Sequence, residues 1–504
     1  MDMDYELPDS PDLPLFPTFD ENLDYCRRLK GDSADVNIRE LVLAGGLRCA
    51  VISVDGMSNQ ELIEHDIILA ARRHADSSGG NKFDPADGVI QMLAASAIEE
   101  EKLISKAFAA VLSGDVLVLI EGAKAAYICG YRAFPSRGVG ESPLEGNLRG
   151  PHEAFTENAR TNTTLIRRRI TDPNLTMEHL SVGRRSSTTV VLCYIKGVVH
   201  AELVNEVRDK INAIDIDIIN DAGEIEQLLE TGHFKSKFKR GLFPLVDGSE
   251  MPDLVARDVS EGRLAIIVGG SPYVLVVPST LDSLMRVGED EYQRWSISTY
   301  VKLLRWAALI ISVIGPALYV AIVAYHPGLL PTDLLIITAR NRADVPFSAI
   351  TEVLLLEFFL ELLREAAIRM PKGIGTSLSI VGGLIIGDSA IKAGLISPFL
   401  IIIIGLTTIA GFTIPSYSLA SSFRLVKYFL LLMSGMLGVL GVTVGTVLTV
   451  SAMVGARSFG TDFTSPFTPL RKQAAAASLI ELPIRLRTRR PEYLDPINET
   501  RFRD

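Results

Sequence analysis

The sequence has few of the residues and motifs that build catalytic or metal sites. It holds four cysteines and seven histidines in 504 residues. The cysteines are scattered, with no metal-ligand spacing, and none lies in the second half of the chain: Cys26, Cys49, Cys129 and Cys193. We expect buried, reduced thiols in a reducing compartment. Because HExxH, HxxEH, Walker A and GxSxG patterns are all missing, the sequence predicts neither an enzyme nor a cofactor or metal site.

The chain begins without the basic and apolar regions of a secretory signal peptide. Residues 1–37 are instead acidic and rich in proline, so we expect a disordered or loosely attached leader there.

Acidic residues are scarce in the second half of the chain. Residues 301–504 contain 19 Lys and Arg against 13 Asp and Glu, whereas residues 1–300 contain 31 against 47. An acidic front half is therefore joined to a basic and very apolar back half. This division indicates a soluble region fused to a membrane domain.

The front half contains the same strand and turn pattern twice. Residues 48–57 and 187–199 are typical of buried strands that end near a glycine, Gly56 or Gly197, and each is followed by a helical pattern. Strand–turn–strand patterns follow after Gly114 and Gly262, and the two glycine pairs are offset by 141 and 148 residues. The repeat predicts two tandem, similar α/β subdomains, with the boundaries 38–150 and 180–285.

Residues 151–179 are expected to form a helical linker between the subdomains. The run Arg167–Arg169 in this linker is typical of a solvated helix face or an interdomain brace, and phosphate binding is the alternative.

Long apolar runs dominate the back half, and several approach the roughly 20 residues that span a bilayer. We expect an all-α polytopic membrane domain over residues 286–456 with four to six helical segments, followed by a basic cytoplasmic tail over 457–504. Positive charge at Lys302/Arg305, Arg369/Lys372 and Arg424/Lys427 would mark the cytoplasmic side. The apolar runs are 303–325, 377–396, 398–415 and 425–453.

Four carboxylates interrupt the apolar stretch 345–371, namely Glu352, Glu357, Glu361 and Glu365. Carboxylates at the centre of a membrane helix cost about 2.5–3.5 kcal/mol each, so these four cannot all face lipid. Glu357, Glu361 and Glu365 share one helix face, from which Glu352 lies apart. Glu361–Arg364 and Glu365–Arg369 are spaced for pairing. The stretch is either an interfacial helix with solvated charges or a helix whose acidic face lines or gates a cation path between subunits.

Two further features of the apolar region indicate helix packing or an ion path. Asp388 and Lys392 are spaced to pair on one helix face, either to lock two spans or to serve an ion path. Gly438, Gly441 and Gly445 lie in one expected span and favour close helix packing, with Gly441 and Gly445 forming a GxxxG pattern.

Several ordered blocks resemble the A subunits of bacterial spore germinant receptors, the GerA family. The similar blocks are RGPHEAFTENARTNTTLIRRRI (149–170), EGRLAIIVGGSPYVLVVP (261–278), PALYVAIVAYHPGLLPTDLL (316–335), VPFSAITEVLLLEFFLELLREAAIRMPKGIG (345–375), SIVGGLIIGDSAIKAGLISP (379–398), FTIPSYSLA (412–420) and RSFGTDFTSPFTP (457–469). The resemblance covers most of the chain from about residue 38 onward. It extends to the accessory stage V sporulation AF-type branch, and departures such as Gly269, where the family usually has Asp, leave the branch open.

The resemblance implies a multi-pass protein of the inner spore membrane whose N-terminal region faces the cytoplasm or spore core. It implies a homo-oligomeric ring that forms a nutrient-gated cation channel, together with a transporter-like B subunit and a C lipoprotein. In the accessory branch, a different small membrane partner would replace them and the channel would amplify ion release. No nucleic-acid partner is implied. A non-conducting membrane scaffold for a nutrient-sensing subunit and a secondary transporter are the alternative functions.

Overall fold

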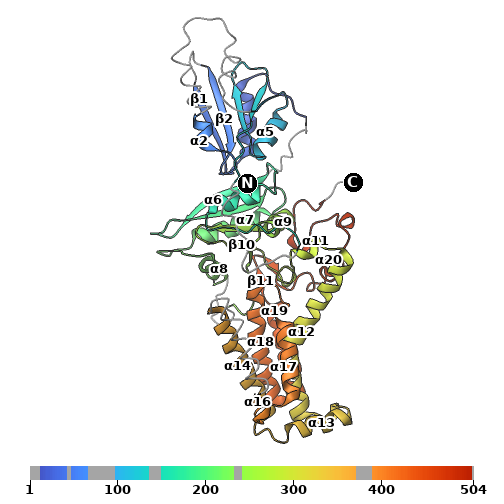
Figure 1. Cartoon of the computed structure of the whole chain (residues 1–504). Helices are drawn as coiled ribbons and strands as arrows, with labels where there is room; N and C mark the ends of the chain where they lie inside the picture. The colour runs from blue at the N-terminus through green and yellow to red at the C-terminus, as the bar shows by residue number, and fades with distance from the viewer. Residues whose placement is uncertain are drawn as a thin grey trace.

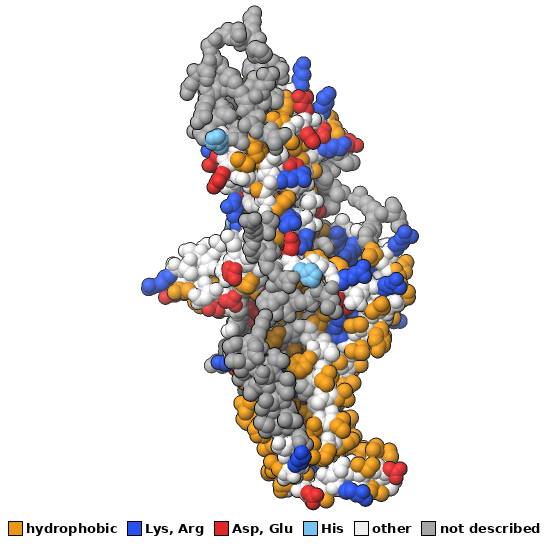
Figure 2. Space-filling view, in the orientation of Figure 1, with side chains coloured by type: hydrophobic (Ala, Val, Ile, Leu, Met, Phe, Trp, Pro, Cys, Tyr) orange, Lys and Arg blue, Asp and Glu red, His pale blue; other side chains and the backbone are white. Residues whose placement is uncertain are grey.

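The computed structural model describes residues 12–42, 47–65, 97–134, 149–231, 241–369 and 389–501. Figure 1 shows an elongated molecule, with two sheet-containing subdomains one above the other at one end and a bundle of long helices at the other. Hydrophobic side chains cover much of the lower half of the surface, whereas charged side chains gather on the upper half and at the lower tip (Figure 2). The predicted division into a polar region and an apolar helical region is therefore visible in the shape.

The first sheet has the strand order β1-β2-β4-β5-β3, and all its pairings are antiparallel. Side chains alternate between its two faces, so that Ala50 and Ile52 pack on one side and Cys49 and Val51 on the other. Both faces of this sheet therefore carry buried apolar side chains. The elements are α1 (Phe19–Lys30), β1 (Val36–Val42), β2 (Arg48–Val54), α2 (Gln60–Leu62), β3 (Ile98–Glu101), α5 (Ile104–Leu112), β4 (Val116–Ile120) and β5 (Ala126–Cys129).

The second sheet repeats this arrangement with the order β6-β7-β9-β10-β8. Helices α6 and α9 cover one face, and α7 and α8 cover the other. The elements are α6 (Ala159–Arg167), β6 (Leu175–Val182), β7 (Thr188–Ile195), α7 (Ala201–Asn212), α8 (Ala222–Thr231), β8 (Asp247–Ser249), α9 (Pro252–Glu261), β9 (Leu264–Val268) and β10 (Val274–Val277). Residues 151–179 are thus not a separate linker, because α6 and β6 belong to this second unit.

The repeated glycines occupy equivalent places in the two units. Gly56 and Gly197 have φ values of 76° and 77°, and Gly114 and Gly262 have φ values of 100° and 106°. These conformations favour glycine because a Cβ atom is strained there. The equal strand order and the equal turn geometry agree with the predicted tandem of similar subdomains.

Part of the expected leader is ordered. Helix α1 begins with a capping box, in which Thr18 accepts a hydrogen bond from the Glu21 amide and Glu21 accepts one from the Thr18 amide. Leu23, Tyr25 and Cys26 are buried against the first sheet. The predicted disordered or loosely attached leader over 1–37 is therefore wrong for residues 19–30, because the Thr18-x-x-Glu21 cap starts a helix that packs on the first sheet.

The four cysteines are buried and not disulfide-bonded, as the sequence predicts. Burial raises the pKa of each thiol to about 12. A thiol with such a raised pKa is a poor nucleophile at neutral pH.

A half-buried carboxylate on α8 gives the second subdomain a predicted pH dependence. Burial, and then the nearby charges of Glu230, Asp247 and Asp221, raise the pKa of Glu226 to about 7 from its ordinary 4.5. The folded state therefore holds its proton more tightly than the unfolded state, and stability present below about pH 4.5 is lost as the pH rises to about 7.

Glu226→Gln should remove this dependence and leave the variant roughly 1–3 kcal/mol more stable than the parent chain above pH 7. Thermal unfolding of the detergent-solubilised chain between pH 5 and pH 8 measures the difference. Glu224→Gln, a change on the same helix, serves as control. Parallel pH profiles for the parent chain and Glu226→Gln would contradict the prediction.

The helical part is built around the long helix α12 (Trp295–Tyr325), which packs on α17 and α18. Helix α14 (Ala349–Arg369) lies beside α18, and α13 (Thr332–Arg342) extends sideways from the lower end of the bundle (Figure 1). Within the described residues, two helices are long and apolar enough to cross a membrane, α12 and α18. The remaining elements are α10 (Leu281–Leu284), α11 (Glu289–Tyr292), η3 (Pro327–Leu329), α16 (Ala390–Lys392), α17 (Pro398–Gly411), α18 (Tyr417–Leu437) and α19 (Val439–Val454).

The expected single span over 425–453 is wrong, because the chain turns at Gly438. Helix α18 ends at Leu437, Gly438 has a φ of 61°, and α19 begins at Val439. A Cβ at Gly438 would lie 2.9 Å from the Cβ of Tyr325, so both conformation and space favour glycine. The expected span 377–396 lies mostly outside the described residues.

The C-terminal segment, predicted as a basic tail, folds back onto the second subdomain. The Ile497 amide donates to the carbonyl of Val198, and Arg490 donates to the carbonyl of Ser260. Glu481 is buried and pairs with Lys302 of α12 and with Arg487. The elements are β11 (Arg457–Ser458), β12 (Thr461–Asp462), α20 (Lys472–Leu479), η5 (Ile484–Leu486) and η6 (Glu492–Leu494).

Candidate functional site

The four carboxylates of the apolar stretch lie along α14, which forms over residues 349–369 as expected. Ser348 precedes the helix, and its hydroxyl accepts a hydrogen bond from the Thr351 amide. Glu352 and Glu365 are 13 residues apart, which spans about 20 Å along a helix. The carboxylates therefore extend over about 20 Å of the bundle and do not gather at one end.

Glu352 is fully buried and meets the start of α17. One carboxylate oxygen accepts a hydrogen bond from the Ser397 amide at 2.5 Å, and the other lies 3.6 Å from the Arg342 guanidinium. The Tyr319 hydroxyl of α12 lies 3.4 Å from the Ser397 hydroxyl. A helix N-terminus favours a negative charge. Glu352 thus ties α14 to α17 and does not share a solvated face.

Glu357 forms a buried ion pair with Lys427 of α18. The Lys427 ammonium donates to the carboxylate at 2.6 Å, and the side chains are only 3% and 10% exposed. Lys427 therefore lies inside the bundle, and its charge is compensated by an opposite charge. Counting Lys427 as a marker of the cytoplasmic side is wrong for this reason.

Glu361 pairs with Arg424 of α18 at 2.9 Å and also with Arg364. Glu365 accepts two hydrogen bonds from Arg369, at 2.5 and 2.9 Å. The predicted pairs Glu361–Arg364 and Glu365–Arg369 are confirmed. The sequence did not identify Arg424 and Lys427 as partners, although Arg424 directly precedes the apolar run 425–453 and Lys427 lies within it.

We call Glu352, Glu357 and Glu361, with Arg424 and Lys427, the charged seam. Two of its buried carboxylate oxygens, Oε2 of Glu352 and Oε1 of Glu357, have no hydrogen-bond partner among the described residues. A buried acceptor without a partner costs roughly 1–3 kcal/mol unless water or an ion satisfies it. Oε2 of Glu352 still faces the Arg342 guanidinium at 3.6 Å, so Oε1 of Glu357 is the more open acceptor for a water molecule or a cation.

The structure describes only some of the other predicted site residues. Asp388 lies outside the described residues, so its pairing with Lys392 stays a prediction. A Cβ at Gly441 would lie 1.9 Å from the carbonyl oxygen of Met433, and one at Gly445 would lie 2.6 Å from a methyl group of Leu430. Gly441 and Gly445 therefore let α19 approach α18, whereas Gly438 forms the turn between these helices.

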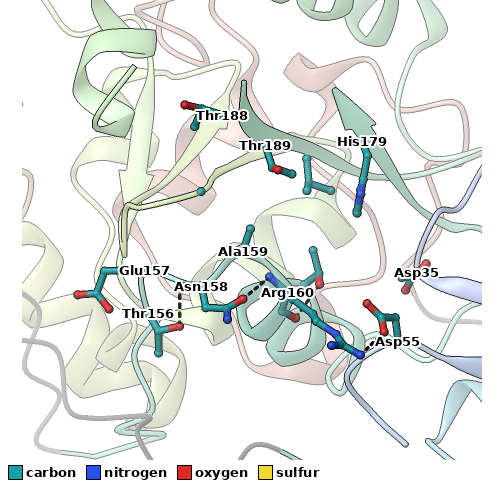
Figure 3. Close-up of a pocket in the computed structure, with 13 residues that line it drawn as sticks. Asp35, Asp55, Thr156, Glu157, Asn158, Ala159, Arg160, His179, Thr188 and Thr189 are labelled. Carbon is teal, nitrogen blue, oxygen red and sulfur yellow. Dashed lines mark hydrogen bonds and ion pairs between the residues drawn. The ribbon is translucent and has the colours of Figure 1, made fainter. Parts of the chain in front are cut away.

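No sequence pattern predicted the cleft between the two subdomains, which has a volume of about 760 Å³. Figure 3 shows Arg160 reaching from α6 toward Asp55, with which it forms an ion pair across the cleft. His179, Thr188 and Thr189 line another side. The cleft is thus bridged by opposite charges from the two subdomains.

Beside this cleft, Arg167 joins the two subdomains. Its guanidinium makes two hydrogen bonds to the Asp35 carboxylate, at 2.8 and 3.1 Å, and donates to the carbonyls of Asp172 and Leu175. Arg167 is 1% exposed and Asp35 4% exposed. Of the three interpretations of the arginine run, the interdomain brace holds for Arg167.

Arg167→Met is expected to destabilise the chain by about 3–5 kcal/mol, because it leaves the Asp35 carboxylate buried without its partner. Arg168→Met is the matched control, since Arg168 is partly exposed and pairs with Glu153 at 3.4 Å. That control should cost less than about 1 kcal/mol. Thermal unfolding of the full chain measures the loss of stability in each variant. Equal losses for both variants would show that Arg167 is no brace.

The chain is similar to known spore germination proteins over most of its length. The model of the family described as "Bacillus/Clostridium GerA spore germination protein" matches residues 24–493. The chain is 34% identical to spore germination protein KA of Bacillus subtilis over 489 residues, covering 97% of this chain and 88% of that protein. It is 32% identical to spore germination protein GerLA of Bacillus cereus over 476 residues, covering 93% and 94%.

A third relative is stage V sporulation protein AF of Bacillus subtilis, 30% identical over 475 residues, which cover 94% of this chain and 93% of that protein. Among solved structures, the N-terminal domain of the A subunit of the Bacillus megaterium spore germinant receptor GerK3 is 26% identical, with a TM-score of 0.39. It covers 54% of this chain and 98% of its own. With a family model that spans nearly the whole chain, the protein belongs to the GerA family of spore germination proteins.

Proposed function

We propose that the protein is the membrane subunit of a spore germinant receptor, and that it oligomerises into a nutrient-gated cation channel. Its helical part spans the inner spore membrane several times, and its two sheets face the spore core. A transporter-like B subunit and a C lipoprotein complete the receptor. The family membership and the apolar surface of the helical part support the membrane assignment.

The charged seam is the observation that most directly supports a cation path. Buried charges inside a membrane bundle are costly, and they usually mark an ion or proton path. Glu352 and Glu357 each keep one carboxylate oxygen without a hydrogen-bond partner among the described residues, about 7.5 Å apart along α14. Such oxygens are suited to replace the hydration shell of a passing cation.

The pairing within the seam supports a closed resting state. The four carboxylates of α14 lie beside five cationic side chains, so the seam together with its neighbouring charges has no net negative charge. The cations are Arg342, Arg364, Arg369, Arg424 and Lys427. We infer that gating separates α14 from α18 and thereby releases Glu357 and Glu361 toward the path. A bare acidic lining, as the sequence suggests, would only exist in this open state.

The same pairing favours one alternative, a scaffold that anchors the N-terminal region and conducts nothing. In that case the ion pairs serve only to hold the helices together. The accessory stage V sporulation AF type is the other alternative, supported by a relative of similar identity and coverage.

Potassium efflux from vesicles that hold the purified chain, alone and with its receptor partners, tests the proposal. A channel gives efflux that depends on the nutrient in the receptor assembly, and an accessory channel gives efflux without a nutrient sensor. A scaffold gives no efflux even as a defined oligomer.

A further inference from the structure

The segment that follows the helical bundle presents an exposed surface that the proposed channel does not use. We define the tail patch as the apolar side chains Leu470, Ile480, Leu482, Ile484 and Leu486 with the basic side chains Lys472, Arg485 and Arg489. All five apolar side chains are more than a third exposed, and Leu470, Ile484 and Leu486 are more than 60% exposed. Contiguous apolar surface of this kind marks an interaction site.

The charges of the tail patch are of one sign. The only acidic residue between 470 and 490 is Glu481, which is buried and paired with Lys302 and Arg487. Lys472, Arg485 and Arg489 are exposed. Figure 2 shows hydrophobic and basic side chains interspersed on the right side of the molecule, where α20 and the following segment lie in Figure 1. Arg489 lies 4.0 Å from the exposed Glu499, so the outward surface is apolar and carries an excess of basic side chains.

The position of the tail patch fits the edge of a bilayer. The Glu481 amide donates to the Thr299 hydroxyl, which fixes the patch beside the first turns of α12. Helix α12 has 31 residues, or about 46 Å at 1.5 Å per residue, so it is longer than a hydrocarbon core of about 30 Å. Its first turns expose Trp295 and Tyr300, residues typical of the membrane–water interface.

We propose that the tail patch docks on the anionic lipid surface of the leaflet nearest the two sheets. Its apolar side chains enter the headgroup region, and Lys472, Arg485 and Arg489 meet the lipid phosphates. The ion pair between Glu481 and Lys302 then holds the docked segment against α12. The inference rests on the membrane placement made under the proposed function.

Fluorescence quenching in nanodiscs tests the docking with the full chain. The chain has two tryptophans, Trp295 and Trp306, so Trp295→Phe with Trp306→Phe gives a tryptophan-free background. Ile484→Trp then reports on the tail patch, Leu406→Trp on the outer face of α17, and Val42→Trp on the first sheet, each at an exposed position. The probes are a lipid with a quencher near its headgroup, a lipid with a quencher deep in its acyl chain, and water-soluble acrylamide.

We expect the lipid quencher to remove most of the emission from Ile484→Trp in discs that contain phosphatidylglycerol, and acrylamide to have little effect. The Val42→Trp indole should show the opposite behaviour. Arg485→Glu with Arg489→Glu should abolish the lipid quenching at Ile484→Trp. The matched control, Arg184→Glu with Arg185→Glu on the exposed β6–β7 turn, should leave it unchanged.

Three outcomes overturn the proposal. Quenching of Ile484→Trp by acrylamide alone, with Leu406→Trp quenched by deep lipid quenchers, rejects the docking but leaves the membrane placement standing. Shielding of Ile484→Trp from both quenchers assigns the patch to a protein neighbour. Failure of Leu406→Trp to respond to any lipid quencher rejects the membrane placement, and the proposed function with it.

Discussion

Lys427→Met is expected to destabilise the helical part by about 3–5 kcal/mol. The Glu357 carboxylate is 3% exposed and would be left in an apolar bundle with neither of its oxygens paired to a cation. The double variant Glu357→Leu with Lys427→Met should recover most of this loss, since well-packed apolar side chains often replace a buried pair at little cost. Thermal unfolding of the detergent-solubilised chain, followed by size-exclusion chromatography, measures both.

The pair Glu365 and Arg369 on the same helix provides the control. Both side chains are more than half exposed, and removing the pair should cost less than about 1 kcal/mol. If Lys427→Met lowers the stability no more than Arg369→Met does, then the Glu357 carboxylate is solvated and the charged seam is not buried. A double variant as unstable as Lys427→Met alone would also contradict the account, because the loss would then come from packing.

Gly441→Ala is expected to cost about 3 kcal/mol or more, because the added methyl group collides with the backbone of α18. The Cβ would lie 1.9 Å from the carbonyl oxygen of Met433 and 2.5 Å from its carbonyl carbon, and backbone atoms cannot rotate aside. The helices α18 and α19 would have to separate. Thermal unfolding in detergent records the loss.

Gly405→Ala on α17 is the matched control, since nothing lies within 4 Å of a Cβ at that position. Alanine favours a helix over glycine by about 1 kcal/mol, so this variant should be neutral or slightly stabilised. Comparable losses at Gly405 and Gly441 would mean that glycine acts through the helix backbone and not through close packing.

The strands could be predicted because their signals are local. Buried apolar runs that end at a glycine with positive φ identified β2 and β7, and their repeat predicted two units of the same kind. The order of the strands could not be predicted, because it depends on contacts between residues far apart in the chain. The ion pair between Arg167 and Asp35 could not be predicted for the same reason, because the two residues are 132 positions apart in the chain and meet only in the folded interior.

In the helical part, hydropathy alone overestimated the length of one span. Residues 425–453 are apolar throughout, and only the conformation of Gly438 shows that two helices meet there. The acidic positions of α14 were evident from spacing, as were the pairs within that helix. Their partners on α18 were not evident, because a single sequence does not reveal which helices lie side by side.

We expect the chain to conduct cations as a defined oligomer, with the charged seam taking part in conduction. Bilayer recordings of the purified oligomer, with its subunits counted in the same preparation, test it most directly. The account predicts a cation-selective conductance that the stably folded variant Glu357→Leu with Lys427→Met changes, while Glu365→Gln with Arg369→Met leaves it unaltered. A silent oligomer, or a conductance identical in the parent chain and the seam variant, would contradict it.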